Sequence, residues 1–209
     1  MTDGIDELRE RIIEAALPHV PFDGWTQRAM RRGAEAIGHD DATARRAFPY
    51  GAADMVREYS RMLDRRTAEA LAGQGLDRLR VRERVAAGVT TRLELMAPHR
   101  EAVRRALSVL ALPLNAPLGM RCLYDTVDLI WRAAGDTATD WNFYTKRTLL
   151  AGVYSSTVLY WLDDKSEDYA DTRAFLDRRI EDAMRLPRTL SSLVRVPACF
   201  SRPARGYRM

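Results

Sequence analysis

The chain has 209 residues, of which 46% are hydrophobic and 30% are charged, and its formal net charge is +4. This composition is enough to bury a core and suits one mid-sized soluble domain, or a small module joined to a larger one. No apolar run reaches the roughly 18 residues that a membrane-spanning helix needs, and the opening MTDGIDELRERIIEAAL is charged from the start. We therefore expect neither a membrane span nor a secretory signal.

The charge is unevenly distributed along the chain. Residues 1–60 carry a net charge of −3, residues 61–107 carry +5 and residues 108–184 carry −4. Residues 185–209 contain six arginines and no acidic residue. The pI of 9.3 is therefore largely a property of the tail and one middle segment, which weakens any inference from a basic pI to nucleic-acid binding.

The first 58 residues predict three short helices. An apolar pattern of helical period over residues 8–17 marks the first helix. Thr26 is a typical cap for a second helix, which ends at about Ile37 before a glycine. The third begins at Asp40 or Asp41 and stops at the sequence FPYG. The tight, glycine-containing turn between the second and third helices indicates a helix-turn-helix.

Helical signals continue after this unit, and strand signals are nearly absent. Proline, glycine and the polar sequence DDKSED separate the later segments. We therefore expect an all-α architecture, in which the helix-turn-helix unit (1–58) packs on a larger helical bundle (59–184) followed by a basic, apolar tail (185–209). The later helices are expected over residues 52–71, 77–96, 101–110, 119–134, 140–162 and 168–185.

The centre of the predicted bundle is unusually apolar. The segment ALSVLALPLNAPLG, Ala106–Gly119, forms a proline-broken corner, and the two following long helices contribute aliphatic and aromatic residues. These side chains either pack as an ordinary core or line a pocket for an apolar ligand. The candidate lipid-binding residues are Leu107, Leu110, Leu114, Leu123, Val127, Leu149, Leu150, Val153, Tyr154 and Val158.

A cluster of large side chains begins the long helix of the bundle. Trp141, Asn142, Phe143 and Tyr144 are adjacent, directly after a helix start that Thr139 can cap. A core helix spaces its large residues three and four apart, so some of this cluster must point outward. We expect Phe143 and Tyr144 to leave an exposed apolar patch, which on a soluble protein usually marks an interface.

The tail, RLPRTLSSLVRVPACFSRPARGYRM, combines apolar residues with arginines alone. That pattern suits an anionic membrane surface, where each arginine adds about 1 kcal/mol of binding free energy; the alternative is a disordered basic tail. Pro187 and Pro197 are expected to limit any helix here to roughly ten residues. The candidate membrane residues are Leu190, Leu193, Val194, Arg195 and Phe200.

Side chains typical of catalysis or metal binding are scattered. His19, His39 and His99 have no carboxylate or second histidine at metal-ligand spacing, and Cys122 and Cys199 have no metal or redox spacing. The sequence has no Gly-rich phosphate loop and no nucleophile elbow. We therefore expect a protein that is not an enzyme and that uses neither a metal site nor a cofactor.

The helix-turn-helix raises the possibility of DNA binding. Its third helix offers Thr43, Arg45 and Arg46 to a groove, but it begins with two aspartates and lies in the segment of net charge −3. Binding that rests on neutralising phosphates is poorly served by this balance. The geometry of a helix-turn-helix suits DNA better than the charge of this segment does. Because of that charge, we do not expect a DNA partner.

Four stretches carry a family resemblance: GWT, LELMAPHREAVRRALSVLALPLNAP, DTVDLIWRAAGDTATDWNFYTKRTLLAGVYSSTVLYWLDD and TRAFLDRRIEDAM. Together they resemble the TetR-like lipid-binding accessory proteins of ubiquinone (coenzyme Q) biosynthesis, the ninth Coq proteins of mitochondria and their alphaproteobacterial relatives. The likeness covers about Gly24 to Met184, and its most specific part is the sequence AGDTATDWNFYT.

The resemblance implies a TetR-like fold, a homodimer and a bundle pocket that binds quinone-like isoprenoid lipid. It also implies docking to the di-iron demethoxyubiquinone hydroxylase, without catalysis by this chain, and a cytoplasmic location at the periphery of the inner membrane. The docking residues that it implies are Asp128, Ile130, Trp131, Phe143, Tyr144 and Arg147.

Two features depart from the family pattern. Mitochondrial relatives have FNWY where this chain has WNFY, so the two ring positions are exchanged. The tail is also shorter than the long amphipathic helix of those relatives. The alternative hypothesis is a TetR-type transcriptional regulator that uses the same pocket for a hydrophobic effector.

Overall fold

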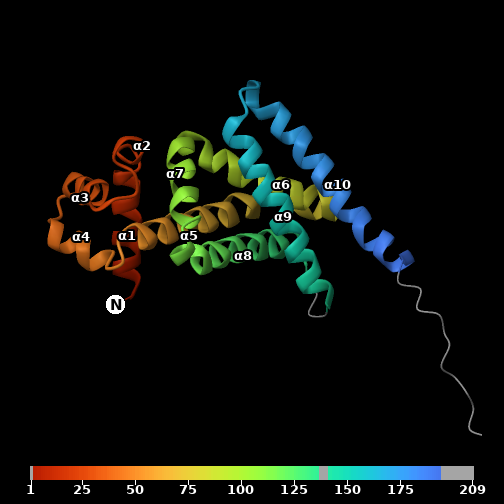
Figure 1. Cartoon of the computed structure of the whole chain (residues 1–209), viewed down its shortest axis with the longest axis horizontal. Coiled ribbons are helices and arrows are strands. Elements are labelled where there is room, and N and C mark those ends of the chain that lie inside the picture. The colour runs from red at the N-terminus through yellow and green to blue at the C-terminus, as the bar shows by residue number, and fades with distance from the viewer. Residues whose placement is uncertain (1, 137–140, 194–209) are drawn as a thin grey trace, which may run out of the picture.

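The computed structural model describes residues 2–136 and 141–193, with side chains over 4–136 and 143–185. The described residues form helices and no strand, so the expected all-α architecture is confirmed (Figure 1). Short 3₁₀ turns precede four of the helices: Leu76–Arg78, Ala97–His99, Pro113–Asn115 and Glu167–Tyr169. The α-helices are α1 (Thr2–Ala16), α2 (Val20–Asp23), α3 (Gln27–Ala36), α4 (Asp41–Ala47), α5 (Ala52–Ala72), α6 (Val81–Met96), α7 (Arg100–Leu110), α8 (Ala116–Ala133), α9 (Trp141–Asp163) and α10 (Ala170–Leu193).

The N-terminal unit consists of α1, α3 and α4, with α2 as one additional turn that was not predicted. The expected cap at Thr26 is confirmed and the third helix starts beside Asp40, whereas Thr139, the expected cap of the long helix, lies outside the described residues. The Thr26 hydroxyl accepts a hydrogen bond from the backbone N–H of Ala29, and the Asp40 carboxylate accepts one from the N–H of Thr43. α3 packs closely on α1 at Gly33, where a Cβ would stand 2.6 Å from the carbonyl oxygen of Ile12.

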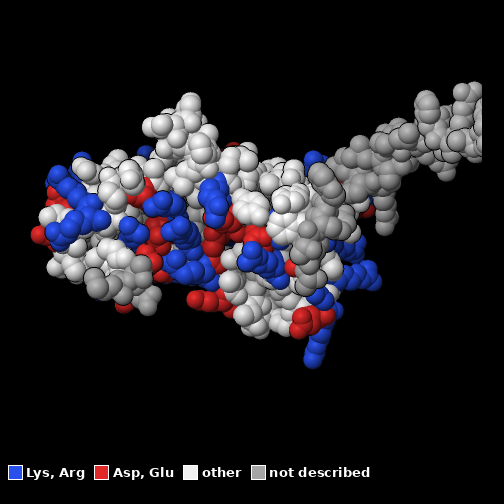
Figure 2. Space-filling view, turned by 90° about the horizontal axis from the view of Figure 1, so that it is seen from below, with Lys and Arg blue, Asp and Glu red and all other residues white. Residues whose placement is uncertain are grey.

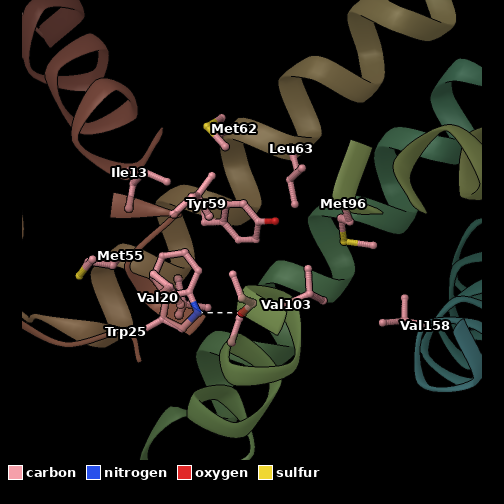
Figure 3. Packing of buried hydrophobic residues seen from close by; sticks show 14 of the residues in the cluster. Ile13, Val20, Trp25, Met55, Tyr59, Met62, Leu63, Met96, Val103 and Val158 are labelled. Carbon is pink, nitrogen blue, oxygen red and sulfur yellow. Dashed lines mark hydrogen bonds between the residues drawn. The ribbon is translucent and has the colours of Figure 1, made fainter. Parts of the chain in front are cut away.

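α5 joins the N-terminal unit to the bundle, running from one into the other (Figure 1). The expected boundary at residues 58 and 59 therefore falls inside one helix. Trp25 strengthens the connection, because its indole N–H donates to the Ala102 carbonyl on α7 at 2.9 Å and its ring packs against Tyr59 on α5. One continuous buried cluster extends from α1 through the bundle (Figure 3).

The bundle consists of α5 to α10, and α10 packs along the outer side of α9 and against α6 (Figure 1). α6 and α8 approach closely at Gly88, where a Cβ would stand 2.8 Å from Ile130. The turn before α10 is fixed by Asp164, whose carboxylate accepts hydrogen bonds from the N–H and hydroxyl groups of Ser166 and Thr172.

The expected end of the last helix at Arg185 is wrong, because α10 continues to Leu193. Pro187 lies inside this helix. A proline inside a helix removes one backbone hydrogen bond and kinks or breaks the helix, and here the helix continues beyond it. Within the described part of the chain, no single helix is both long and apolar enough to span a membrane; a pair bent by 94°, Val81–Leu110 with Pro113–Ala133, meets those criteria only together.

Candidate functional site

An apolar cavity of about 330 Å³, which we call the central cavity, lies between α5, α6, α7, α8 and α9. The helices line it because each contributes positions at helical spacing: α7 through residues 103, 106, 107 and 110, and α8 through 119, 122, 123 and 126. Figure 3 shows Leu63, Met96 and Val103, which also line it, converging from three elements. Half of the candidate lipid-binding residues lie on its wall: Leu107, Leu110, Leu123, Tyr154 and Val158.

One part of the wall of the central cavity is polar. The buried Arg92 guanidinium donates to the Tyr154 hydroxyl at 2.8 Å and forms an ion pair with Asp64 at 2.5 Å. Thr126 donates to the same carboxylate at 2.9 Å. Burial raises the pKa of Asp64, whereas Arg92 and the Thr126 hydroxyl oppose that rise. A charged arginine therefore faces an otherwise apolar space with its charge already balanced.

α5 contributes cavity residues that the sequence analysis did not single out. They include Val56, Tyr59, Ser60 and Leu63, which lie at the i, i+3, i+4, i+7 spacing of one helix face. That spacing is the signal in the sequence from which these cavity residues could have been predicted. Cys122 also lines the cavity, and burial raises the pKa of its thiol, which disfavours the nucleophilic thiolate.

A second cavity, of about 300 Å³, lies between α6, α8, α9 and α10, and we call it the α9–α10 cavity. Leu149, Leu150 and Val153 line it, so the candidate lipid-binding set is divided between two cavities. The remaining two candidates line neither cavity. Val127 is fully packed in the core, and Leu114 is 91% exposed at the proline-broken corner. The prediction that Leu114 lines a lipid-binding pocket is therefore wrong, because Leu114 lies on the Pro113–Asn115 turn and is exposed.

A wider hollow of about 730 Å³ lies between α5, the Leu76–Arg78 turn and α8. Its wall includes the carboxylates of Asp64, Asp77, Asp125 and Asp128. Despite its size, this hollow is a poor site for a lipid, because its wall carries four carboxylates, and burying charged groups against hydrocarbon is unfavourable. Over the described residues, no group of histidine, cysteine or acidic side chains is arranged to hold a metal ion.

The corner between α8 and α9 is held by buried ion pairs. Arg147, with its side chain 4% exposed, contacts Asp128 at 2.6 Å and Asp136 at 3.2 Å. Each aspartate has a second, more exposed partner, Arg132 at 2.7 Å from Asp128 and Lys146 at 2.6 Å from Asp136. Opposite charges paired in this way tie the first part of α9 to α8 and to Asp136.

The six candidate docking residues divide into a buried and an accessible group. Ile130 is fully buried, and the buried Asp128 and Arg147 belong to the ion-pair network, so these three hold the corner from within. The accessible group is Trp131, Phe143 and Tyr144. The Trp131 indole donates to the Lys146 carbonyl at 3.1 Å, and the half-buried Phe143 ring lies 3.4 Å under the Arg147 guanidinium.

Tyr144 is the most exposed of the docking candidates, at 64%, and its ring packs edge-on against Phe143. Of the two rings expected to point outward, Tyr144 is exposed, whereas Phe143 is half-buried under Arg147. The side chains of Trp141 and Asn142, the other members of the aromatic cluster, lie outside the described residues.

Known proteins resemble this chain over most of its length. The COQ9 family matches residues 116–187, which cover α8, α9 and much of α10. Mitochondrial ubiquinone biosynthesis protein COQ9 of Rattus norvegicus is 36% identical over 192 residues, 88% of this chain and 61% of its own length. The Homo sapiens protein is 35% identical (88% and 60%), and that of Drosophila melanogaster is 32% identical (95% and 62%).

The chain is thus similar to the COQ9 family over α8, α9 and much of α10. It spans about three fifths of the length of these relatives. A TetR transcriptional regulator from Nitrosomonas europaea superimposes on this chain with a TM-score of 0.68, covering 85% of it and 98% of the regulator at 20% identity. That likeness confirms the TetR-like fold.

The N-terminal unit carries arginines that are largely engaged within it. Arg45 pairs with Asp41 at 2.6 Å and Arg46 donates to Thr43 at 2.9 Å, both within α4. Figure 2 shows positive and negative side chains intermixed over the visible face. A groove-binding helix needs unpaired cations to neutralise phosphates, so this pairing does not favour DNA binding.

The candidate membrane residues lie at or beyond the end of the described chain. Leu190 and Leu193 are on α10, but their side chains are outside the described residues. Val194, Arg195 and Phe200 lie outside them entirely.

Proposed function

We propose that this protein belongs to the COQ9 family and takes part in ubiquinone biosynthesis as a non-catalytic accessory protein that binds a quinone-like or isoprenoid lipid in the central cavity. The observation that carries the proposal is an apolar cavity of about 330 Å³ lined by five helices of the bundle. The names of the relatives, which associate those proteins with ubiquinone biosynthesis, support the choice of lipid class.

The proposal includes delivery of the lipid to the di-iron demethoxyubiquinone hydroxylase. The docking surface would be the rings of Phe143 and Tyr144 with Trp131, presented by the ion-paired corner of α8 and α9. We propose further that the protein is a homodimer of alphaproteobacterial type. It would act in the cytoplasm, at the inner membrane, to which the basic tail would attach it.

Native mass spectrometry followed by lipid extraction tests the proposal. The purified protein should carry an isoprenoid or quinone lipid, and Leu107→Trp, which fills the central cavity, should abolish its retention. Leu112→Trp is the matched control, because Leu112 follows the same helix but is 55% exposed. An unchanged protein that carries no lipid and takes up none when supplied would refute the proposal.

The runner-up function is transcriptional regulation, which the observed helix-turn-helix geometry and the TetR-like fold favour. A regulator would retard specific genomic fragments in a gel-shift assay at physiological salt, with affinity falling as salt rises. We expect no specific retardation, because α4 begins with acidic side chains and Arg45 is paired.

A further inference from the structure

Tyr59 is a buried polar side chain on the wall of the central cavity. Its residue is 3% exposed, and its ring packs against Trp25 with the ring centroids 5.2 Å apart. Trp25 is itself held by its hydrogen bond to Ala102. In Figure 3 the Tyr59 hydroxyl points away from Trp25 and toward the side where Leu63 and Met96 line the cavity. The hydroxyl is therefore held in a fixed direction.

The Tyr59 hydroxyl has no hydrogen-bond partner among the described residues. Several described side chains have a buried nitrogen or oxygen atom without a hydrogen-bond partner. Among them, Tyr59 is the one that lines the central cavity. Neighbouring hydroxyls are satisfied: Tyr154 accepts from Arg92, and Thr126 donates to Asp64. A buried hydroxyl without a partner is unfavourable and requires an explanation.

Burial raises the pKa of Tyr59 well above its ordinary value, so the hydroxyl stays protonated and keeps its hydrogen to donate. The charged groups near the Tyr59 hydroxyl indicate which kind of ligand atom would accept its hydrogen bond. Arg92 is the cation beside the cavity, and Asp64 already balances it at 2.5 Å. A ligand phosphate would find no unpaired cation here, whereas a neutral oxygen needs none.

We infer that Tyr59 is a specificity-determining residue that donates a hydrogen bond to a neutral carbonyl oxygen on the ring head of the bound lipid. This inference rests on the proposed lipid-binding function and deepens it. The head would lie at the Tyr59 end, and the hydrocarbon tail would leave past Leu110 and the exposed Leu159 on the same cavity wall. A cavity of about 330 Å³ is at the small end of ligand pockets and suits a ring with a short length of tail.

Equilibrium dialysis with two matched probes tests this inference. One probe is a dimethoxy-methyl-benzoquinone with a two-isoprene tail, and the other is the two-isoprene hydrocarbon without the ring. Tyr59→Phe should weaken quinone binding about 3- to 10-fold, the range expected for one hydrogen bond, and leave hydrocarbon binding unchanged. Tyr50→Phe, at a residue 79% exposed, should change neither.

The outcomes separate the two proposals. If the unchanged protein binds neither probe, the proposed function fails. If it binds both, and Tyr59→Phe binds the quinone equally well or loses both probes to the same extent, only the assignment of Tyr59 fails. A short-chain phosphatidylglycerol bound more tightly than the quinone, and weakened by Tyr59→Phe, would also overturn the assignment.

A second test changes the ligand instead of the protein, so it remains valid even if Tyr59→Phe does not fold. The unchanged protein should bind the quinone about 3- to 10-fold more tightly than an analogue with hydrogen in place of both carbonyl oxygens. Equal affinities would overturn the inference.

Discussion

Replacing Arg147 by Met isolates the contribution of the buried ion pairs at the α8–α9 corner. The substitution keeps much of the side-chain length and removes the charge that meets Asp128 at 2.6 Å and Asp136 at 3.2 Å. Breaking a buried pair typically costs about 3–5 kcal/mol, because it leaves an uncompensated charge. Arg132 and Lys146 still contact the two aspartates, so we expect a smaller loss of unfolding free energy, about 2–4 kcal/mol.

Urea denaturation at fixed protein concentration measures this loss, and Arg132→Met is the matched control. Arg132 contacts the same Asp128 but is 74% exposed, so its removal should cost only about 0–1 kcal/mol. In thermal unfolding, Arg147→Met should lower Tm by about 5–12 °C for a chain of this size. A cost no greater than that of Arg132→Met would refute the idea that the buried network holds the corner.

Three further predictions test the surface patch, the acidic turn and the N-terminal packing. Phe143→Ala with Tyr144→Ala should leave the helical circular dichroism and lipid content intact while abolishing hydroxylase binding in pull-down assays; an unfolded double variant would place the rings in the core instead. The hydrogen bonds that Asp164 accepts outweigh its desolvation and lower its pKa to about 2, so its stabilisation is present above about pH 4 and lost as pH falls toward 2. Acid titrations of unfolding should show that loss in the native chain and not in Asp164→Asn. Gly33→Ala should lower Tm, because its Cβ would stand 2.6 Å from the Ile12 carbonyl oxygen, and an unchanged Tm would contradict the close α1–α3 contact.

Local signals predicted most of the helices and several of their ends. Thr26 and Asp40 cap helices as expected, because a side-chain oxygen beside a helix start satisfies a free N–H whatever the tertiary context. The end of α10 was missed for the opposite reason. Pro187 is a local signal to stop, but the backbone stays helical through it to Leu193.

The candidate site was only partly predictable. Hydrophobic periodicity shows which residues are apolar and which face they share, but not which of two neighbouring cavities a face borders. Leu107 and Leu150 were grouped together for this reason, although different helix pairs enclose them. The polar wall was missed because Asp64, Arg92 and Tyr154 lie far apart in the sequence, and only tertiary packing brings them together.

The docking residues implied by family resemblance also acquire different roles in the structure. A resemblance transfers positions without saying whether a side chain is accessible. Ile130 and Arg147 are buried, so substitutions there should affect a partner through the shape of the corner, whereas Tyr144 can contact it directly. Stability measurements therefore have to accompany any binding data on this patch.

The crossing of α5 between the two parts of the fold has a consequence for protein engineering. Val56 and Tyr59 lie on either side of residue 58 and both line the central cavity, and Trp25 packs behind Tyr59. The helix-turn-helix unit thus supports the wall of the central cavity from behind, independent of any role in binding DNA. Shortened versions of this protein that begin at residue 59 would lose Val56 from that wall and Trp25 from behind it, so the region that looks most dispensable for lipid binding is one that the chain has to retain.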